Sequence, residues 1–234
     1  MRALFIAFAL LLAGFPLARA AQPVDVELVL VTDVSRSIVS SEFALEKQGY
    51  ASAIESPEVL NAIKQGPIGA IAVSYVEFSG PHQITTVVGW QRIDNLATAR
   101  KFAAAMLAEP RSSVGRTAIG SAIAAAVGDL AESGLTATRR MIDVCGDGND
   151  NAGIAMHVAR AEAGKAGVTI NGLAIIHDNP PPWLVPHVDP PGGLVKYYHD
   201  HVIAGPGSFV MQVHDYHDFG TAMTRKLVLE IASG

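Results

Sequence analysis

The sequence predicts one three-layer α/β domain, with a mainly parallel central sheet, one antiparallel edge hairpin and helices on both faces. Three observations support this fold class. Strand-like apolar runs alternate with helical patterns along almost the whole chain. The first run, VDVELVLVT at 24–32, is rich in Val and Leu, which is typical of a parallel strand buried on both faces. Only the short segment SGPH separates the next two runs, and a gap of that size joins antiparallel strands.

The other elements follow in order along the chain. A helix is expected at 41–55, where Phe43, Tyr50 and Ile54 form one stripe, and the hairpin strands at 69–78 and 83–90. Next we expect two helices, a strand, a helix and a strand, at 94–107, 118–130, 139–146, 154–166 and 168–176. After an irregular stretch rich in Pro, Gly and His, a strand and a helix are expected at 208–213 and 219–231. The pattern contains no internal repeat or long linker, so 21–234 is expected to be a single domain.

The first segment, 1–20, has the pattern of a secretory signal peptide. Arg2 precedes an apolar segment that ends near Ala13, and Ala18-Arg19-Ala20 is a small-residue cleavage site. The alternative, a membrane anchor, is disfavoured because the apolar segment is shorter than the ~20 residues that a span requires. We therefore expect cleavage near Ala20, a periplasmic or secreted protein, and no membrane span in the mature chain.

The composition restricts the classes of partner. Without Arg2 and Arg19, 15 basic residues remain against 22 acidic ones, a net charge of −7. This balance disfavours nucleic acid and anionic membranes as partners. Cys145 is the only cysteine, so the exported chain has no internal disulfide and depends on its core for stability. Because Cys145 lies on a predicted central strand without a neighbouring Lys or His, we interpret it as a buried small side chain rather than a reactive thiol.

Three groups of polar residues lie at predicted strand ends, where parallel α/β sheets bind their ligands. They follow the first strand, precede the helix at 118–130, and follow the strand at 139–146. Their members are Asp33, Ser35, Ser37, Thr117 and Asp147. Two carboxylates and three hydroxyls suit a hard divalent cation, Mg²⁺ before Ca²⁺ or Mn²⁺, and the absence of His and Cys from the set disfavours zinc. An incompletely filled coordination shell would accept an acidic side chain from a partner protein.

Each group alone has an ordinary structural explanation. A Ser/Thr/Asp cluster after a strand usually caps the next helix, Thr117 alone is a common N-cap, and Gly-Asp-Gly-Asn is a common turn composition. What favours a shared site is the occurrence of all three groups, in this order, at strand ends.

Together these groups resemble the metal-ion-dependent adhesion site (MIDAS) of the von Willebrand factor type A (vWA) domain. That family's motif is D-x-S-x-S after the first strand, a threonine before a central helix and an aspartate after the fourth strand. The corresponding segments here are DVSRS at 33–37, GRTAIG around Thr117 and CGDGND around Asp147. The stretches GPIGAIAVSYVEFSGP, DVCGDGNDN and YYHDHVIAGPGSFV are also similar to a group of exported bacterial proteins that consist of little more than this domain.

This resemblance covers essentially the whole mature chain and implies a Rossmann-like vWA fold. It also implies a metal-dependent protein-protein interaction rather than catalysis. In the family, the positions of Asp33, Ser35 and Ser37 are core ligands, Thr117 ligates directly or through water, and Asp147 commonly acts through water.

A metal-dependent hydrolase or phosphatase is one alternative. Haloacid-dehalogenase phosphatases also have an aspartate after the first strand, but their second aspartate is replaced here by Ser35, so the general acid is missing. The chain also has no G-x-S-x-G elbow, and GDGNDN lacks the GK[ST] ending of a P-loop.

A periplasmic metal-handling protein that uses its histidines is the other alternative. Six of the eight histidines lie at or after position 177, toward the end of the chain: His177, His187, His199, His201, His214 and His217. On an extended segment, His199 and His201 would turn both imidazoles to one side, as a Zn²⁺ or Cu²⁺ site requires. Solvated surface histidines explain the same pattern, and we favour that interpretation.

Overall fold

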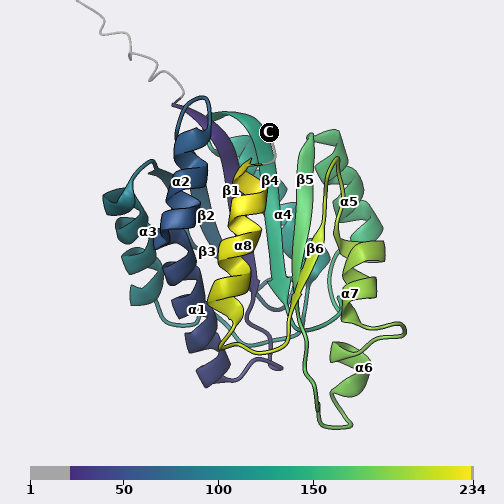
Figure 1. Ribbon diagram of the computed structural model, residues 1–234. Coiled ribbons are helices and arrows are strands. Elements are labelled where there is room, and N and C mark those ends of the chain that lie inside the picture. The colour runs from purple at the N-terminus through teal and green to yellow at the C-terminus, as the bar shows by residue number, and fades with distance from the viewer. Residues whose placement is uncertain (1–21, 233–234) are drawn as a thin grey trace, which may run out of the picture.

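In the computed structural model, which describes residues 22–232, six strands form one sheet in the order β3-β2-β1-β4-β5-β6 (Figure 1). Neighbouring strands are parallel except β2 and β3, which form an antiparallel pair at one edge. The strands are β1 (Pro23–Asp33), β2 (Ile71–Phe78), β3 (Ile84–Ile93), β4 (Thr136–Gly146), β5 (Val168–Ile175) and β6 (Val210–Val213). The predicted fold class is confirmed.

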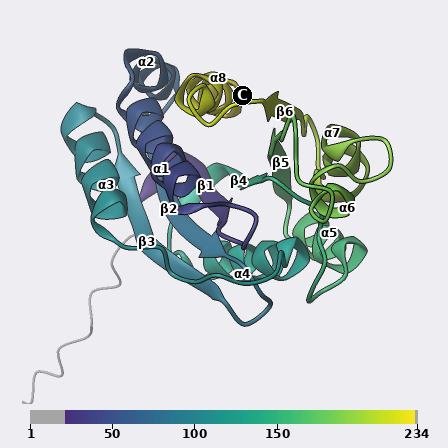
Figure 2. The same ribbon diagram turned by 90° about the horizontal axis from the view of Figure 1, so that it is seen from below.

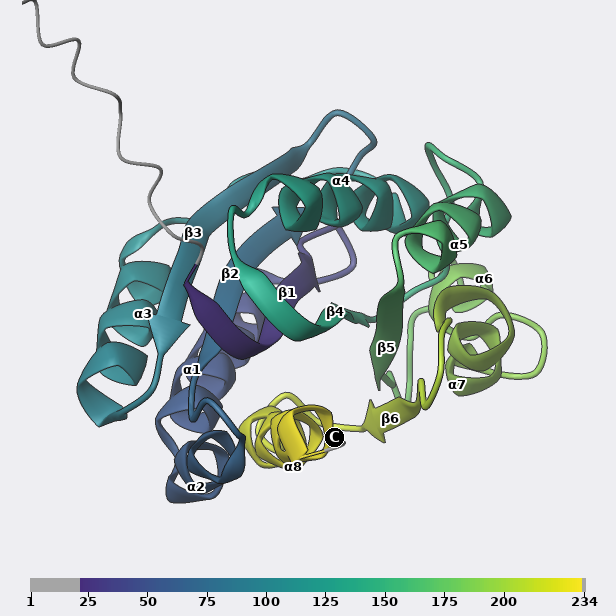
Figure 3. The same ribbon diagram turned by 90° about the horizontal axis from the view of Figure 1, so that it is seen from above.

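Helices cover both faces of the sheet (Figure 3). One face packs against α1 (Ser40–Glu55), α2 (Pro57–Gln65), α3 (Leu96–Ala108) and α8 (Phe219–Ala232). The other face packs against α4 (Ile119–Glu132), α5 (Met156–Lys165) and the last two of the three short segments that follow β5. The three segments are α6 (Val185–Val188), α7 (Leu194–Tyr197) and the π-helix η1 (Tyr198–Val202). The two apolar clusters therefore form two cores, one on each side of the sheet.

The strands in the middle of the sheet owe their burial to this double covering. All of β2, and all of β1 after Pro23, is buried, which is the reason that their sequences are nearly continuous apolar runs. The edge strand β3 is only partly buried and carries more polar residues. The apolar content of each strand thus follows its position in the sheet.

Two parts of the fold differ from the sequence-based expectation. The prediction omitted α2, although its first turn has a clear start signal, with Ser56 accepting a hydrogen bond from the amide of Val59 and Pro57 in the first helical position. The stretch expected to be irregular contains α6, α7 and η1. The extended segment proposed for His199 and His201 is therefore wrong, because both residues lie in η1.

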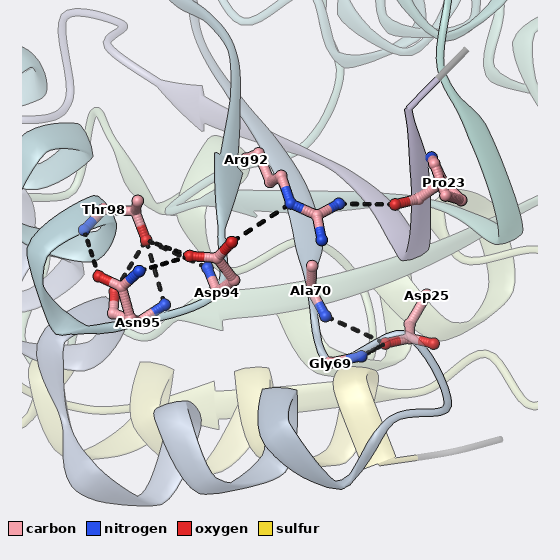
Figure 4. Close-up of polar contacts among 8 residues, drawn as sticks. All are labelled: Pro23, Asp25, Gly69, Ala70, Arg92, Asp94, Asn95 and Thr98. Carbon is pink, nitrogen blue, oxygen red and sulfur yellow. Dashed lines mark hydrogen bonds and ion pairs between the residues drawn. The ribbon is translucent and has the colours of Figure 1, made fainter. Parts of the chain in front are cut away.

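At the end of the sheet where the parallel strands begin, hydrogen bonds hold Asp25 and Pro23 of β1 (Figure 4). The Asp25 carboxylate accepts the amide N–H groups of Ile68, Gly69 and Ala70 at 3.0, 2.8 and 3.2 Å. On the edge strand, Arg92 donates to the carbonyl of Pro23 at 2.6 Å. Asp25 therefore has its hydrogen-bond partners within the chain.

The signal peptide predicted at 1–20 lies outside the described residues. Within 22–232, no helix combines the length and the apolar character that crossing a membrane requires.

Candidate metal centre

The predicted ligands meet at the opposite end of the sheet, where the parallel strands have their carboxyl ends. Figure 2 views the molecule from this side. Ser37 Oγ donates to Asp147 Oδ1 at 2.7 Å, although the two residues are 110 positions apart in the chain. Ser35 Oγ lies 3.0 Å from Ser37 Oγ, and the Ser35 amide donates to Asp33 Oδ1 at 2.7 Å. Four of the five predicted residues are therefore joined by hydrogen bonds. Thr117 lines the same depression as the two serines.

Asp33 is fully buried at the end of β1, and its second carboxylate oxygen, Oδ2, has no hydrogen-bond partner among the described residues. Burial raises the pKa of Asp33 well above its usual range, and the negative charge of Asp147 raises this pKa further. A Cβ at Gly146 would lie only 3.0 Å from Asp33 Cβ and 2.9 Å from the Tyr198 hydroxyl, so glycine is needed for β1 and β4 to end this close together. A buried acceptor without a partner is costly, and a bound cation would remove that cost.

Arg111 fixes the turn that carries Ser35 and Ser37 by hydrogen bonds to its backbone carbonyls. Its guanidinium donates to the Val34 carbonyl at 3.2 Å through Nε, to the Ile38 carbonyl at 2.9 Å and also to the Ser35 carbonyl. The same guanidinium lies 5.7 Å from the centre of the Phe43 ring. Because the turn's carbonyls are bound by Arg111, its backbone is fixed and the serine hydroxyls remain available to the cluster. Sequence reasoning missed this residue.

Thr117 is positioned by the turn that follows β4. The backbone N–H of Asn151 donates to the Thr117 carbonyl at 2.9 Å. The backbone N–H of Thr117 in turn donates to the side-chain oxygen of Asn151 at 3.1 Å. Asp150 Oδ1 accepts the amide of Gly120 at 3.2 Å in the first turn of α4. The GDGNDN segment therefore does more than carry Asp147, since it also joins the β4 end to the start of α4.

Two histidines that are not members of the predicted ligand set lie beside it. His177 follows β5 and has Nε2 2.8 Å from Asp147 Oδ2, a hydrogen bond that raises the pKa of His177. His187 lies in α6 with Nε2 3.2 Å from Thr117 Oγ1 and Nδ1 2.8 Å from Asn149 Oδ1. Burial lowers the pKa of His187, which favours a neutral ring. The sequence signal for these residues was only the high histidine content of the final third.

The pair His199 and His201 is not arranged as a second metal site. Two residues that are two positions apart on a helix point to nearly opposite sides, and both side chains are exposed. His199 bonds to Asp200, and the His201 ring packs 5.0 Å from the ring of Tyr197. In the described part of the chain, His, Cys, Asp and Glu side chains by themselves form no group of three or more that could hold a metal ion. The predicted set differs from such a group because it combines two acids with three hydroxyl groups.

The surface around the cluster is an open depression of about 660 Å³. Exposed side chains beside it include the cations Arg36 and Arg116 and the apolar Trp183, which is 76% exposed. Val39 and Val114, next to the two ligand-bearing loops, are also more than half exposed. Cations and an exposed aromatic ring at one place are suited to an acidic protein surface.

Cys145 lies on β4, two residues before Asp147, and is fully buried. Burial raises the pKa of its thiol well above the usual range, so the thiolate is disfavoured. The interpretation of Cys145 as a buried small side chain is confirmed.

Comparison with known proteins gives a family and a fold. The family model described as "Protein of unknown function (DUF1194)" matches residues 23–234. No curated protein matches the sequence. Solved structures that are similar include proximal thread matrix protein 1 from the mussel byssus with a zinc occupied MIDAS motif (TM-score 0.59, 17% identity, 91% of this chain and 49% of that chain). Others are the pilus adhesin SpaC from Lactobacillus rhamnosus GG (0.61, 15%, 89% and 30%) and a von Willebrand factor type A structure from Catenulispora acidiphila (0.58, 14%, 89% and 42%).

The chain spans less than half the length of these three solved chains. At these identities the likeness shows the fold, which is that of the vWA domain. The resemblance stated from the DVSRS, GRTAIG and CGDGND segments is thereby confirmed at the level of the fold.

Proposed function

Since this chain belongs to the DUF1194 family and has the vWA fold, we propose that it is an exported module that binds a divalent cation and, through that cation, a partner protein. The observation that carries the proposal is Asp33 Oδ2, a fully buried carboxylate oxygen without a hydrogen-bond partner among the described residues. It belongs to the same carboxylate that accepts the Ser35 amide, beside the hydroxyl chain that leads to Asp147. A cation held there would compensate the buried acid.

The proposed ligands are Asp33, Ser35, Ser37, Thr117 and Asp147. From these oxygen donors alone, Mg²⁺ is the expected ion, with Ca²⁺ or Mn²⁺ as substitutes. When bound, the ion supplies a positive charge that can accept one further oxygen from outside the chain. The chain's own residues do the rest: Arg111 and Asn151 hold the ligand-bearing turns, and the buried position of Asp33 keeps water from competing for its carboxylate.

The partner is proposed to present an acidic side chain to the ion. Arg36 and Arg116 add positive charge beside the depression, and Trp183 adds apolar contact area. A binding function rather than an enzymatic one is supported by the pilus adhesin among the similar structures, and export is supported by the signal-peptide pattern of the sequence at 1–20.

The metal half of the proposal is tested by titrating the purified protein with Mg²⁺ in a calorimeter. We expect saturable binding by the wild type and a loss of about 100-fold or more in affinity for Asp33→Ala, because one of the two fully buried acids in the ligand set is removed. The matched control is Glu58→Ala, which removes an exposed acid on α2. Equal Mg²⁺ affinities for wild type and Asp33→Ala would refute the site.

The partner half is tested by recovering proteins from the source cell's envelope fraction with wild-type and Asp33→Ala baits, each with Mg²⁺ and with a chelator. A partner that is retained only by the wild type, and only with metal, would support the proposal. Recovery of the same proteins by both baits would remove the interaction role while leaving the fold assignment intact.

A further inference from the structure

The imidazole of His187 is oriented as metal-ligating histidines usually are. Its Nδ1 lies 2.8 Å from Asn149 Oδ1, and its Nε2 lies 3.2 Å from Thr117 Oγ1. The amide nitrogen of Asn149 is directed to the Pro186 carbonyl at 3.4 Å, so Asn149 Oδ1 accepts a proton from Nδ1. Asn151 Nδ2 is farther from Nδ1, at 3.4 Å. This network assigns the proton to Nδ1 and leaves the lone pair on Nε2, the arrangement in which a second residue orients a histidine ligand.

Nε2 of His187 lies directly against the backbone that carries Asp147. A Cβ at Gly148 would come within 2.1 Å of this nitrogen, so the ring occupies space that only a glycine leaves open. On the other side of the ring is Thr117 Oγ1, one of the proposed ligands. The ring thus stands between the two loops from which Asp147 and Thr117 extend.

The donor atoms form two groups, His187 with Thr117 and the two serines with Asp147, and the spacing within each group is that of adjacent metal ligands. Adjacent ligands in an octahedral shell, with bonds of about 2.1 Å, lie about 3 Å apart. The distance from His187 Nε2 to Thr117 Oγ1 is 3.2 Å, and the two serine hydroxyls are 3.0 Å apart. The distance from Ser37 Oγ to Asp147 Oδ1 is 2.7 Å. No rearrangement of these neighbouring pairs is needed before they can serve as adjacent ligands.

We propose that His187 contributes Nε2 as a nitrogen ligand, so that this centre binds a transition-metal dication such as Zn²⁺ or Co²⁺ more tightly than Mg²⁺. The inference rests on the proposed function, because it concerns the same ion site. Its chemical basis is that imidazole suits Zn²⁺ and its neighbours in the first transition row, whereas Mg²⁺ requires oxygen ligands. His177 has a different role: its Nε2 is engaged with Asp147 Oδ2, which makes it a positioning residue for that carboxylate.

The test compares the affinities of the purified protein for Zn²⁺ and for Mg²⁺, each metal alone, in wild type and His187→Gln. We expect Zn²⁺ to bind more tightly than Mg²⁺ in the wild type. In His187→Gln, Zn²⁺ affinity should fall by about tenfold or more, while Mg²⁺ affinity changes less than about threefold. The matched control, His199→Gln, removes an exposed histidine in η1 and should leave both affinities unchanged.

A spectroscopic measurement identifies the nitrogen directly. With Mn²⁺ as the probe, pulsed electron paramagnetic resonance should detect a ¹⁴N coupling to the ion in wild type and in His177→Gln, and should not detect it in His187→Gln. If His187→Gln does not fold, the wild type and His177→Gln still decide the question. Absence of the coupling from either of them would overturn the proposal, as would an equal loss of Zn²⁺ and Mg²⁺ affinity in His187→Gln.

The failure of this inference can be distinguished from the failure of the proposed function. If Asp33→Ala binds all ions as the wild type does, the metal centre itself is wrong. If Asp33→Ala abolishes binding but His187→Gln leaves the ratio of Zn²⁺ to Mg²⁺ affinity unchanged, only the nitrogen ligand is wrong.

Discussion

Two groups of buried acids differ in how their charge is balanced. Between the sheet and α8, Lys226 lies 2.6 Å from Asp143 Oδ1 and also forms an ion pair with Glu230, and all three side chains are fully buried. At the carboxyl edge of the sheet, Asp33 is equally buried, but its Oδ2 has no hydrogen-bond partner within the described residues. The first group has a buried cation in direct contact with its acids, whereas at Asp33 burial and the charge of Asp147 outweigh the attraction of Arg111 and raise the pKa of this acid.

This difference separates a structural role from a binding role. The Lys226 group joins β4 to α8, and Asn171 on β5 adds a hydrogen bond to Glu230 at 2.9 Å. Nearby, Arg139 donates to the carbonyls of Glu230 and Ile231 at 2.7 and 2.6 Å, which fixes the last turn of α8. Removing one member of a buried ion pair is costly because the other charge is left without compensation. By the same reasoning, the proposed cation would compensate the buried Asp33 carboxylate.

The largest effect on stability is expected from Lys226→Met. This change leaves Asp143 and Glu230, like Asp33, buried without a cation in direct contact. Asp143 and Glu230 would be left buried without a cation, so the free energy of unfolding should fall by about 3–5 kcal/mol. Urea denaturation at pH 7 measures this loss. The control is Arg225→Met, an exposed position on the same helix, which should change stability by less than about 0.5 kcal/mol. Equal stabilities of the two variants would mean that the buried cation does not balance these acids.

An intermediate effect concerns the pH dependence of the Lys226 group. Burial and the charge of Glu230 outweigh the attraction of Lys226 and raise the pKa of Asp143 to about 7. The folded protein therefore holds a proton on Asp143 up to about pH 7, while the unfolded chain releases it near pH 4. The contribution of Asp143 to stability is consequently greatest below pH 4 and declines as the pH rises to about 7.

Asp143→Asn isolates this contribution because the amide cannot titrate and has nearly the same volume as the carboxyl group. Between pH 5 and pH 7, the unfolding free energy of the wild type should fall relative to that of the variant by up to about 1.4 kcal/mol per pH unit. Denaturant unfolding at several pH values measures the two slopes. Parallel slopes for wild type and variant would show that Asp143 does not take up a proton on folding.

The fold and the proposed oxygen ligands were predictable because their signals are local. Apolar strands and helix stripes are visible within short windows, and the carboxyl ends of parallel strands necessarily meet at one edge. The D-x-S-x-S segment, Thr117 and Asp147 could therefore be assigned to that edge before their contacts were known.

The residues that surround these ligands were not predictable because they come from unrelated parts of the chain. His187 is 70 residues from Thr117, and Arg111 is 77 residues from Val34. Neither residue lies in a periodic segment, and their packing depends on the loop after β5 and the loop before α4. The alternative of a second metal site at His199 and His201 depended on an extended backbone. The chain forms η1 there, so a spacing of two residues does not place both rings on one side.

The smallest effect on stability is expected from Asp33→Asn in the presence of a chelator. Its sign distinguishes the two groups of acids. Because Oδ2 has no hydrogen-bond partner and burial disfavours the carboxylate, replacing this acid by a neutral amide should raise the free energy of unfolding by about 1 kcal/mol at pH 8. Chemical denaturation of metal-free wild type and variant measures the change. Lys226→Met lowers stability because Asp143 and Glu230 lose a buried cation in direct contact, whereas no ion pair between described residues involves Asp33, and the more distant Arg111 is retained in Asp33→Asn. A decrease of about 1 kcal/mol or more in Asp33→Asn would instead mean that this acid is already compensated within the chain, and the reason for expecting an external ion at the edge of the sheet would disappear.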